Sequence, residues 1–491
     1  MSSASSCKPS TAAGWRWDHS YARLPEIFFT RTQPTPVAAP ALTLLNRPLA
    51  ISLGLDPEAL EHAAAIFAGN EIPPGSDPIA QAYAGHQFGN FTNLGDGRAI
   101  LLGEHLTPSG QRLDIQLKGP GRTPYSRGGD GRATLGPMLR EYIISEAMHA
   151  LGIPTTRSLA VATTGEDVFR QEILPGAVLT RIAASHLRVG TFQYAAAHED
   201  LPALRTLADY AIQRHFPELA GPETCYYDFF LAVLDRQAAL IAQWLCVGFI
   251  HGVMNTDNMA ICGETIDYGP CAFIDAYDPS TVFSSIDHQG RYAYDQQPQI
   301  ARWNLARLAE SLLPLLHPDP KIAADLANEA LSSFENHFQG HWLRGMRSKL
   351  GLVTAENDDA ALVQELLDGM HAHHLDFTNT FRTLSTETAI AQPPFTHAGF
   401  LTWHTKWSAR LTRQPQSARE SAEEMRGHNP AVIPRNHQVE LALAAAVQHG
   451  DLSVTHRLLA ALADPYGPTP PPEFTTPPPA SAPAYQTFCG T

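Results

Sequence analysis

Three oxygen-bearing side chains lie close together in the middle of the sequence. Asp257 and Asn258 are adjacent, and Asp267 follows a turn at Gly263-Glu264. The apolar runs on either side of that turn predict a short hairpin. Because a hairpin returns its two ends to the same place, we expect the three side chains to converge. Carboxylate and amide oxygens suit Mg²⁺ or Mn²⁺ held together with substrate phosphates. The alternative is a surface turn rich in Asn and Asp.

A second candidate region is a Gly-rich, basic stretch over residues 112–140. It carries a local charge of +4 inside a chain whose formal charge is −15. Glycine lets backbone N–H groups approach an anion, and arginine offers bidentate donors, so the stretch is suited to phosphates. Residues 93–98 have the same character. The alternative is a pair of exposed turns with solvated arginines. The basic residues are Arg112, Lys118, Arg122, Arg127, Arg132 and Arg140.

Lys118 and Glu141 form a candidate ion pair within this region. Lys118 ends an alternating stretch, 114–118, that predicts a strand. Glu141 lies on a helix expected over 136–151, between apolar side chains. A semi-buried carboxylate needs a cation. Lys118 is one candidate, which would fix its ammonium for a polyphosphate, and Arg140 or Arg122 is the alternative.

These two groups together have the layout of a protein kinase. Asp267-Tyr268-Gly269 stands where kinases carry the metal-binding Asp-Phe-Gly. In kinase-like enzymes with a His-Gly-Asp start, the catalytic Asp follows the His by two positions. Here Val253 follows His251 by two positions, so the usual base is missing. The nearest carboxylate is Asp257.

The elements that must position these residues fall into two halves. Short alternating runs dominate up to about residue 180, and helical patterns dominate afterwards. We therefore expect an α+β, protein-kinase-like fold with a strand-rich N-lobe and a helical C-lobe. The expected helices cover 57–68, 136–151, 228–249, 304–316, 321–339, 358–373 and 438–463. The expected divisions are an N-terminal extension over 1–75, a nucleotide-binding N-lobe over 76–180, a C-lobe over 181–400, a helical extension over 401–463 and a Pro-rich tail over 464–491.

Composition excludes several classes of function. With 34 basic and 49 acidic residues, the chain is a poor candidate for binding nucleic acid or an anionic membrane. Its six cysteines contain no CxxC pair, which disfavours a disulfide framework or a zinc site. The spacing of His371, His373 and His374 likewise predicts no metal site. The first 20 residues lack an apolar stretch, so we expect a cytoplasmic protein.

The long motifs resemble the selenoprotein O (SelO) family, protein adenylyltransferases with a pseudokinase fold. The resemblance runs from about residue 20 to about residue 455. The motifs that carry it occupy 83–90, 94–99, 116–133, 139–142, 251–259, 267–270, 287–292 and 433–437.

The resemblance implies transfer of AMP from ATP to protein Ser, Thr or Tyr hydroxyls, with pyrophosphate leaving. It implies that Asp257 accepts the proton, that Asn258 and Asp267 bind Mg²⁺ or Mn²⁺, and that Glu141 pairs with the lysine. We expect a monomer. The implied nucleotide-binding residues are Gly95, Gly97, Arg98, Lys118, Asp130, Gly131, Arg181, Arg188 and Asp267. Spacing alone would place Arg181 and Arg188 on a solvated helix face.

Cys489 raises a redox question. It lies on the Pro-rich tail, where a thiol is expected to be exposed and reactive. Some relatives are thought to use such a cysteine as a latch onto the activation segment. Here that segment, 272–300, holds no Cys. An unpaired tail thiol, or pairing with Cys271 or Cys262, is the alternative.

Two rival functions stay open from the sequence. One is a phosphotransferase, which the valine in the base position disfavours. The other is a non-catalytic ATP-binding scaffold, which has no need of the metal-type residues.

Overall fold

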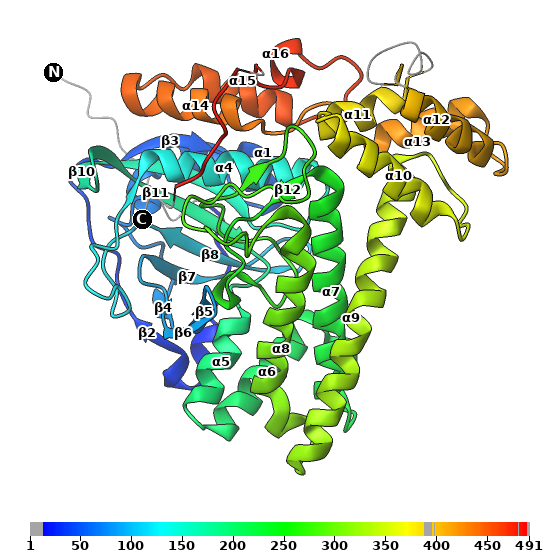
Figure 1. Ribbon diagram of the computed structural model, residues 1–491. Helices are drawn as coiled ribbons and strands as arrows, with labels where there is room; N and C mark the ends of the chain where they lie inside the picture. Colours follow the sequence, from blue (N-terminus) through cyan, green and yellow to red (C-terminus); the bar gives the residue numbers. More distant parts are fainter. Residues whose placement is uncertain (1–12, 387–394, 397, 480, 489–491) are drawn as a thin grey trace.

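The computed structural model describes residues 13–386, 395–396, 398–479 and 481–488. Its first part is rich in strands and its second part is helical (Figure 1). This division confirms the α+β class and the two-lobed fold that the sequence predicts.

An antiparallel sheet of nine strands forms the first lobe. Its main order is β2-β4-β7-β8-β11-β10-β3, with β1 paired to β7 and β9 paired to β11. Two small ladders, β5-β6 and β12-β13, lie apart from it. The strands are β1 Trp17–Asp18, β2 Phe29–Arg31, β3 Ala41–Leu45, β4 Ile79–Gln81, β5 Ala84–Gln87, β6 Asn90–Asn93, β7 Ala99–Leu106, β8 Arg112–Lys118, β9 Ala133–Thr134, β10 Arg157–Phe169, β11 Ile173–Ala183, β12 Phe249–Ile250 and β13 Ala272–Phe273.

The alternation within β8 explains why its last residue faces the site. Ile115 and Leu117 are fully buried in an apolar cluster that also contains Phe67 of the N-terminal helices. Side chains alternate across a strand. Gln116 and Lys118 therefore point to the opposite face, which α4 covers. The helices of this lobe are α1 Arg47–Ser52, α2 Pro57–Glu61, α3 Ala64–Phe67 and α4 Leu135–Ala150.

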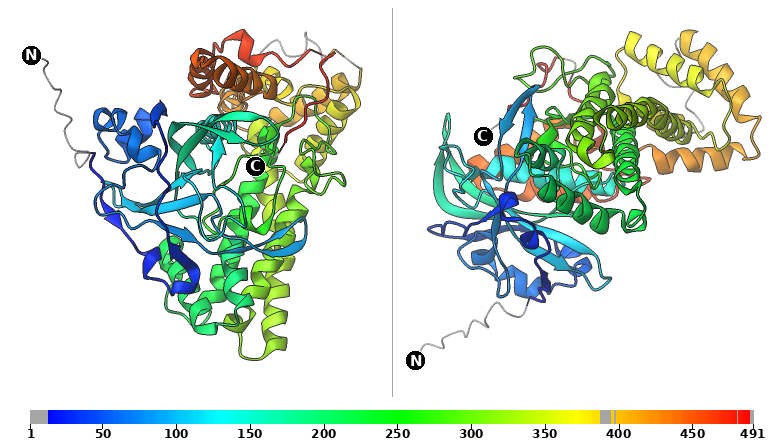
Figure 2. Two further views of the ribbon diagram at one scale, coloured as in Figure 1. Left: turned by 90° about the vertical axis from the view of Figure 1, so that its left-hand side faces the viewer. Right: turned by 90° about the horizontal axis from the view of Figure 1, so that it is seen from below.

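The second lobe is built around α7, which packs against α8 and α9. Helices α14 and α15 return to pack on α4, and α10–α13 lie at the end of the molecule away from β10 (Figures 1 and 2). The helices are α5 Val189–Ala197, α6 Leu201–His215, α7 Cys225–Val247, α8 Gln297–Leu316, α9 Pro320–Lys349, α10 Asp359–Ala372, α11 Phe377–Leu384, α12 Ala398–Leu411, α13 Ala418–His428, α14 Asn436–His449, α15 Ser453–Leu462 and α16 Pro472–Thr475.

Among the described residues, α7 alone has the length and apolar composition that could cross a membrane. Inside the protein, 61% of its most apolar window is buried. A core helix passes the same test, and α7, which covers most of the helix expected over 228–249, packs against α8 and α9.

Three local predictions are wrong. The helix expected over 438–463 is two helices, because Gly450 adopts a φ of 64° and ends α14. The helix expected over 57–68 is likewise two, α2 and α3. The hairpin expected around Gly263 does not form as a ladder. Instead, Ala260 pairs with Arg188 and Thr265 pairs with Thr155, partners distant in sequence.

Candidate active site

Lys118 connects the sheet to both carboxylates that the sequence singles out. Its Nζ donates to Glu141 Oε2 at 2.7 Å and to Asp267 Oδ1 at 2.5 Å. Lys118 and Glu141 are buried, at 7% and 2% side-chain exposure. Of the candidate partners that the sequence offered for Glu141, Lys118 is therefore the one that pairs with it. Arg140 instead contacts Glu440 and Tyr485. A strand lysine held by a helix glutamate is the arrangement that positions nucleotide phosphates in protein kinases.

Arg181, on β11, holds the other oxygen of Glu141. Its Nε donates to Glu141 Oε1 at 2.7 Å, and its Nη2 lies 3.7 Å from Asp267 Oδ1. Burial alone would raise the pKa of Asp267, but Lys118 and Arg181 hold it well below its usual range. Burial opposes the ionisation of Glu141 too, and the same two cations lower the pKa of that carboxyl. Both carboxylates are thus ionised.

Arg188, which precedes α5, contacts Asp257 and Asp96. Its Nη1 donates to the backbone oxygen of Asp257 at 2.7 Å, and its Nη2 lies 3.8 Å from Asp96 Oδ1. The guanidinium stacks on the ring of Tyr83, 4.5 Å from the centroid. Arg188 is buried, not on the solvated helix face that its spacing suggests.

Asp257 has an environment suited to a proton acceptor. Burial raises the pKa of its carboxyl to about 6, although Arg188 opposes the shift. Its Oδ1 is buried and finds no hydrogen-bond partner among the residues that the structure describes. Gly85 of β5 passes so close that an added Cβ would lie 2.2 Å from that oxygen. A carboxyl with such a pKa can take up and release a proton near neutral pH.

Asn258 lies beside Asp257 in the turn 256–258. Its Nδ2 donates to the backbone oxygen of Val253 at 3.1 Å, so the amide is fixed with Oδ1 left as an acceptor. Val253 itself is buried and offers no carboxylate. Asp257 and Asp267 act on each other electrostatically, and each acts on Arg188. The structure therefore places Asp257 and Asp267 within electrostatic reach of each other, without the predicted hairpin.

The two glycines of the 93–98 loop allow close packing against a second loop. Gly95 has a φ of 106°, and an added Cβ would lie 2.5 Å from the Tyr125 ring. At Gly97 an added Cβ would lie 2.8 Å from the Tyr125 backbone oxygen. The neighbouring Arg98 acts on Asp267 and helps to lower the pKa of that carboxyl. Arg98 thus lies within electrostatic reach of Asp267.

Asp130 and Gly131 contact other parts of the Gly-rich loop. Asp130 accepts two hydrogen bonds from Arg170, at 2.8 and 3.0 Å, and its side chain is 46% exposed. Gly131 has a φ of 67° and packs on Gly121. Among the described contacts, neither residue meets the Lys118–Asp267 pair.

The +4 stretch is not a single basic surface. Arg112 pairs with Asp18 at 2.7 Å, and Arg132 binds the backbone oxygen of Thr35 at 3.1 Å. Of the stretch, Lys118 enters the site described above. Half of the basic residues, Arg112, Arg132 and Arg140, thus pair with carboxylates other than those of the site.

Sequence reasoning missed three residues of the site: Asp96, Tyr83 and Gln116. Asp96 is buried, its pKa is raised by that burial to about 6, and it accepts from Gln116 Nε2 at 3.3 Å. Gln116 also contacts Arg181 at 3.3 Å. The sequence did carry signals for two of them: Asp96 stands between two glycines, and Gln116 lies on the same strand face as Lys118, two positions before it.

Cys489 lies outside the described residues. The tail just before it lies along the segment 272–300, where Thr487 and Ser284 form a parallel bridge. Thr487 Oγ1 also donates to the Pro270 backbone oxygen at 2.8 Å. Cys271 is buried close by, and burial raises the pKa of its thiol to about 12.

Comparison with known proteins agrees with the sequence motifs. The family model described as "Protein adenylyltransferase SelO" matches residues 13–463. The protein nucleotidyltransferase YdiU of Brevibacillus brevis is 61% identical over 99% of both chains. The YdiU protein of Geobacillus kaustophilus is 61% identical over 98% of this chain and all of its own.

One solved structure, ROP2 from Toxoplasma gondii, is described as a virulence factor with a protein-kinase fold and no enzymatic activity. It shares 11% identity over 68% of this chain and 88% of its own, with a TM-score of 0.25. The full-length family match and the high identities are the decisive findings. The chain belongs to the SelO family of protein adenylyltransferases.

Proposed function

We propose that this protein transfers AMP from ATP to Ser, Thr or Tyr hydroxyls of other proteins and releases pyrophosphate. The observation that carries the proposal is the ion-pair network of the buried Lys118, Glu141 and Arg181 with the partly exposed Asp267, within electrostatic reach of the titratable carboxyl of Asp257. A scaffold that only bound ATP would gain nothing from a second carboxylate, Asp257, whose pKa is raised while that of Asp267 is lowered.

Three buried cations supply the charge that a triphosphate requires. Lys118, Arg181 and Arg188 come from β8, β11 and the start of α5, and all are less than 10% exposed. Charged donors are strongest where water is excluded. Phosphoryl and nucleotidyl transfer depend mainly on such charge stabilisation, because the protein need form no covalent bond.

The donor set fits a hard divalent cation. Asp267 is ionised, Asn258 keeps an amide oxygen available, and Asp257 Oδ1 is buried without a partner. We assign Asn258 and Asp267 as the residues that would hold Mg²⁺ or Mn²⁺. When bound, the cation would neutralise phosphate charge.

Asp257 is suited to accept the proton of the attacking hydroxyl. A pKa of about 6 leaves the carboxyl ionised at neutral pH but still basic. The hydroxyl oxygen would form a bond to the α-phosphorus, and the bond to the pyrophosphate oxygen would break. Val253 occupies the position of the catalytic base of kinases and carries no carboxylate, which disfavours phosphotransfer.

A cavity of about 880 Å³ supports a protein acceptor. Its walls combine apolar side chains, among them Phe88 and Trp303, with polar ones such as Asp287 and Gln299, so it offers both kinds of surface to a peptide. Phe88 N and the Tyr292 hydroxyl both bond to Asn255 Oδ1, at 3.1 and 2.7 Å. The cavity wall is therefore fixed to the loop that carries the proposed base.

The test uses ATP labelled at either the α- or the γ-phosphate, with Mg²⁺ or Mn²⁺ and a mixture of candidate proteins. Label on protein from the α-position alone supports AMP transfer. Label from the γ-position alone would establish a phosphotransferase, and label from neither, with ATP still bound, would establish a scaffold. The Asp257→Asn protein is the control and is expected to give no α-label.

A further inference from the structure

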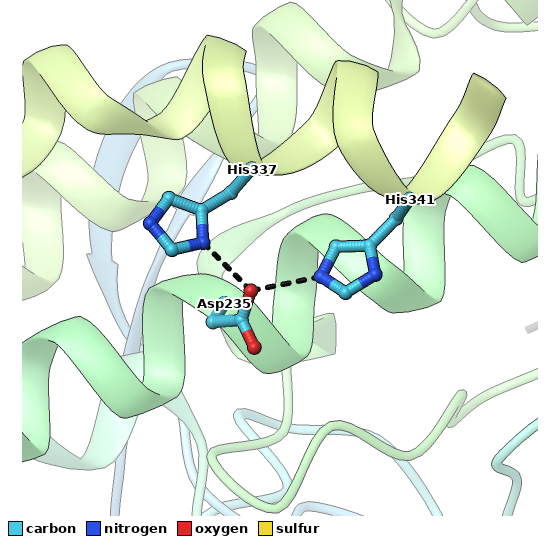
Figure 3. Close-up of side chains that lie close together, drawn as sticks. All are labelled: Asp235, His337 and His341. Carbon is cyan, nitrogen blue, oxygen red and sulfur yellow. Dashed lines mark hydrogen bonds and ion pairs between the residues drawn. The ribbon is translucent and has the colours of Figure 1, made fainter. Parts of the chain in front are cut away.

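Two histidines of α9 and one aspartate of α7 form a cluster outside the ATP site. His337 Nδ1 and His341 Nε2 lie 2.7 and 2.8 Å from the same oxygen, Asp235 Oδ1 (Figure 3). We propose that Asp235, His337 and His341 bind a transition-metal ion, preferentially Zn²⁺, which joins α7 to α9. The proposal is independent of the AMP-transfer reaction.

The helix geometry preorganises the two imidazoles. His337 and His341 are four residues apart on α9, so they share one face. Asp235 approaches from α7, which packs directly against α9. Figure 3 shows both rings directed at the carboxylate between the helices. The ligand atoms of the three side chains all lie within 4.8 Å of one another.

The spacing is close to that of a tetrahedral site. With metal–ligand bonds of about 2.0 to 2.1 Å, neighbouring ligand atoms lie about 3.3 Å apart. The two nitrogen–oxygen distances of 2.7 and 2.8 Å must therefore widen by roughly half an ångström. The side chains have room to rotate, since His337 is 40%, His341 23% and Asp235 46% exposed.

The ligand types select the metal. Imidazole nitrogens with one carboxylate suit Zn²⁺, Co²⁺ or Ni²⁺, whereas Mg²⁺ and Ca²⁺ prefer oxygen ligands alone. Three protein ligands leave a fourth position for water, which the exposure of the cluster permits. Arg344 Nη1 lies 3.4 Å from the other nitrogen of His341, a weak contact that metal binding at Nε2 would release.

The test is equilibrium dialysis of the full chain against Zn²⁺ in excess Mg²⁺, which occupies the oxygen ligands of the ATP site. Wild type is expected to retain one more equivalent of Zn²⁺ than His341→Asn or Asp235→Asn. His428→Asn is the matched control. His428 also lies beside a carboxylate on one helix, Glu424 at 3.4 Å, but among the described residues no third ligand joins them.

Two further readouts keep the result interpretable. Co²⁺ should give wild type and His428→Asn a visible d–d band of tetrahedral intensity that His341→Asn lacks. Zn²⁺ should raise the melting temperature of the same two proteins, because the ion binds only the folded form. Circular dichroism confirms that each variant is folded. AMP transfer with Mg²⁺ should stay at the wild-type rate in His341→Asn, which separates this site from the proposed function.

Equal Zn²⁺ stoichiometry in wild type and in both ligand variants would overturn the proposal. So would a cobalt spectrum that is unchanged by the His341 substitution. In either case the cluster would be a hydrogen-bonded contact between the helices and nothing more.

Discussion

The guanidinium of Arg181 donates from Nε to Glu141 Oε1 at 2.7 Å, on the carboxylate oxygen that Lys118 leaves unused. Arg181 and Glu141 are 3% and 2% exposed. A single buried carboxylate thus ties two strands of the sheet, β8 and β11, to helix α4. Arg181 is therefore a structural support of the lysine as well as a cation near the phosphates.

Arg181→Met is expected to lower the free energy of unfolding by about 3 to 5 kcal/mol, because it leaves the buried carboxylate of Glu141 and the partly exposed one of Asp267 with a single cation. The same variant should lose AMP transfer. Urea denaturation followed by tryptophan fluorescence measures the first effect, and α-labelled ATP the second. A variant within about 1 kcal/mol of wild type would contradict the role of Arg181 as a support.

Arg170→Met is the matched control for Arg181. It removes the pair with Asp130, which lies on the partly exposed Gly-rich loop. Exposed ion pairs contribute about 0 to 1 kcal/mol, so stability should hardly change. The AMP-transfer rate of Arg170→Met then tests the role of Asp130, because Arg170 holds that carboxylate in place. A large loss of rate would indicate that Asp130 contacts the nucleotide.

Asp257→Asn and Asp267→Asn are expected to shift stability in opposite directions at pH 8, although both should abolish transfer. The folded protein raises the pKa of Asp257 from 3.8 to about 6, so the ionised form is destabilising. Two pKa units correspond to about 3 kcal/mol, the upper limit for the gain in Asp257→Asn. The folded protein lowers the pKa of Asp267, so Asp267→Asn removes stabilisation.

The pH dependence checks the sign of each effect. The gain in Asp257→Asn should be complete above pH 6 and should disappear once the pH falls below 3.8, where the wild-type carboxyl is protonated in both states. The loss in Asp267→Asn should persist throughout that range, because this carboxyl stays ionised in the folded protein. Melting curves at several pH values measure both. Equal shifts at pH 4 and pH 8 for Asp257→Asn would refute the assigned pKa.

Local patterns predicted the Lys118–Glu141 pair well. Period-two alternation placed Lys118 on one face of β8, and the helical period placed Glu141 among apolar residues of α4. Asp267 could be placed only as a neighbour of Asp257, and its contact with Lys118 joins residues 149 apart. No sequence period encodes such a contact.

Long-range pairing also explains what the sequence could not predict. The runs around Gly263 have the pattern of a hairpin, but Ala260 and Thr265 find partners elsewhere, at Arg188 and Thr155. The same pairing draws Arg188 into the site. Its burial therefore depends on the tertiary fold, and spacing within its own segment carried no sign of it.

Gly85→Ala should reduce kcat for AMP transfer, and it should also lower the melting temperature, because the new Cβ would lie 2.8 Å from Cδ1 of the buried Leu94. The new Cβ would lie 2.2 Å from Asp257 Oδ1 and 2.8 Å from its Cγ, so the carboxylate must move. Displacing a catalytic group by about 1 Å can cost roughly 100-fold in rate. Gly399→Ala is the control, because no atom of the described residues lies within 4 Å of its added Cβ. Wild-type kcat in Gly85→Ala would show that the position of Asp257 is not critical.

Truncation after residue 479 should accelerate amide exchange at Ser285. The Ser285 N–H donates to the Thr487 backbone oxygen at 2.9 Å, and Thr487 N donates back to Phe283 O at 2.8 Å, so the tail protects this part of the segment 272–300. Hydrogen exchange measured by mass spectrometry reports the change. Ala293, whose N–H bonds within the segment to Gly290 O, should exchange as before.

Thr487→Val separates the side chain of that residue from its backbone. It removes only the hydroxyl bond to Pro270 O, at 2.8 Å, and keeps both backbone bonds. Its effect on Ser285 exchange should therefore be much smaller than that of the truncation. Equal protection of Ser285 in the truncated and full-length proteins would mean that the tail does not hold the segment in solution.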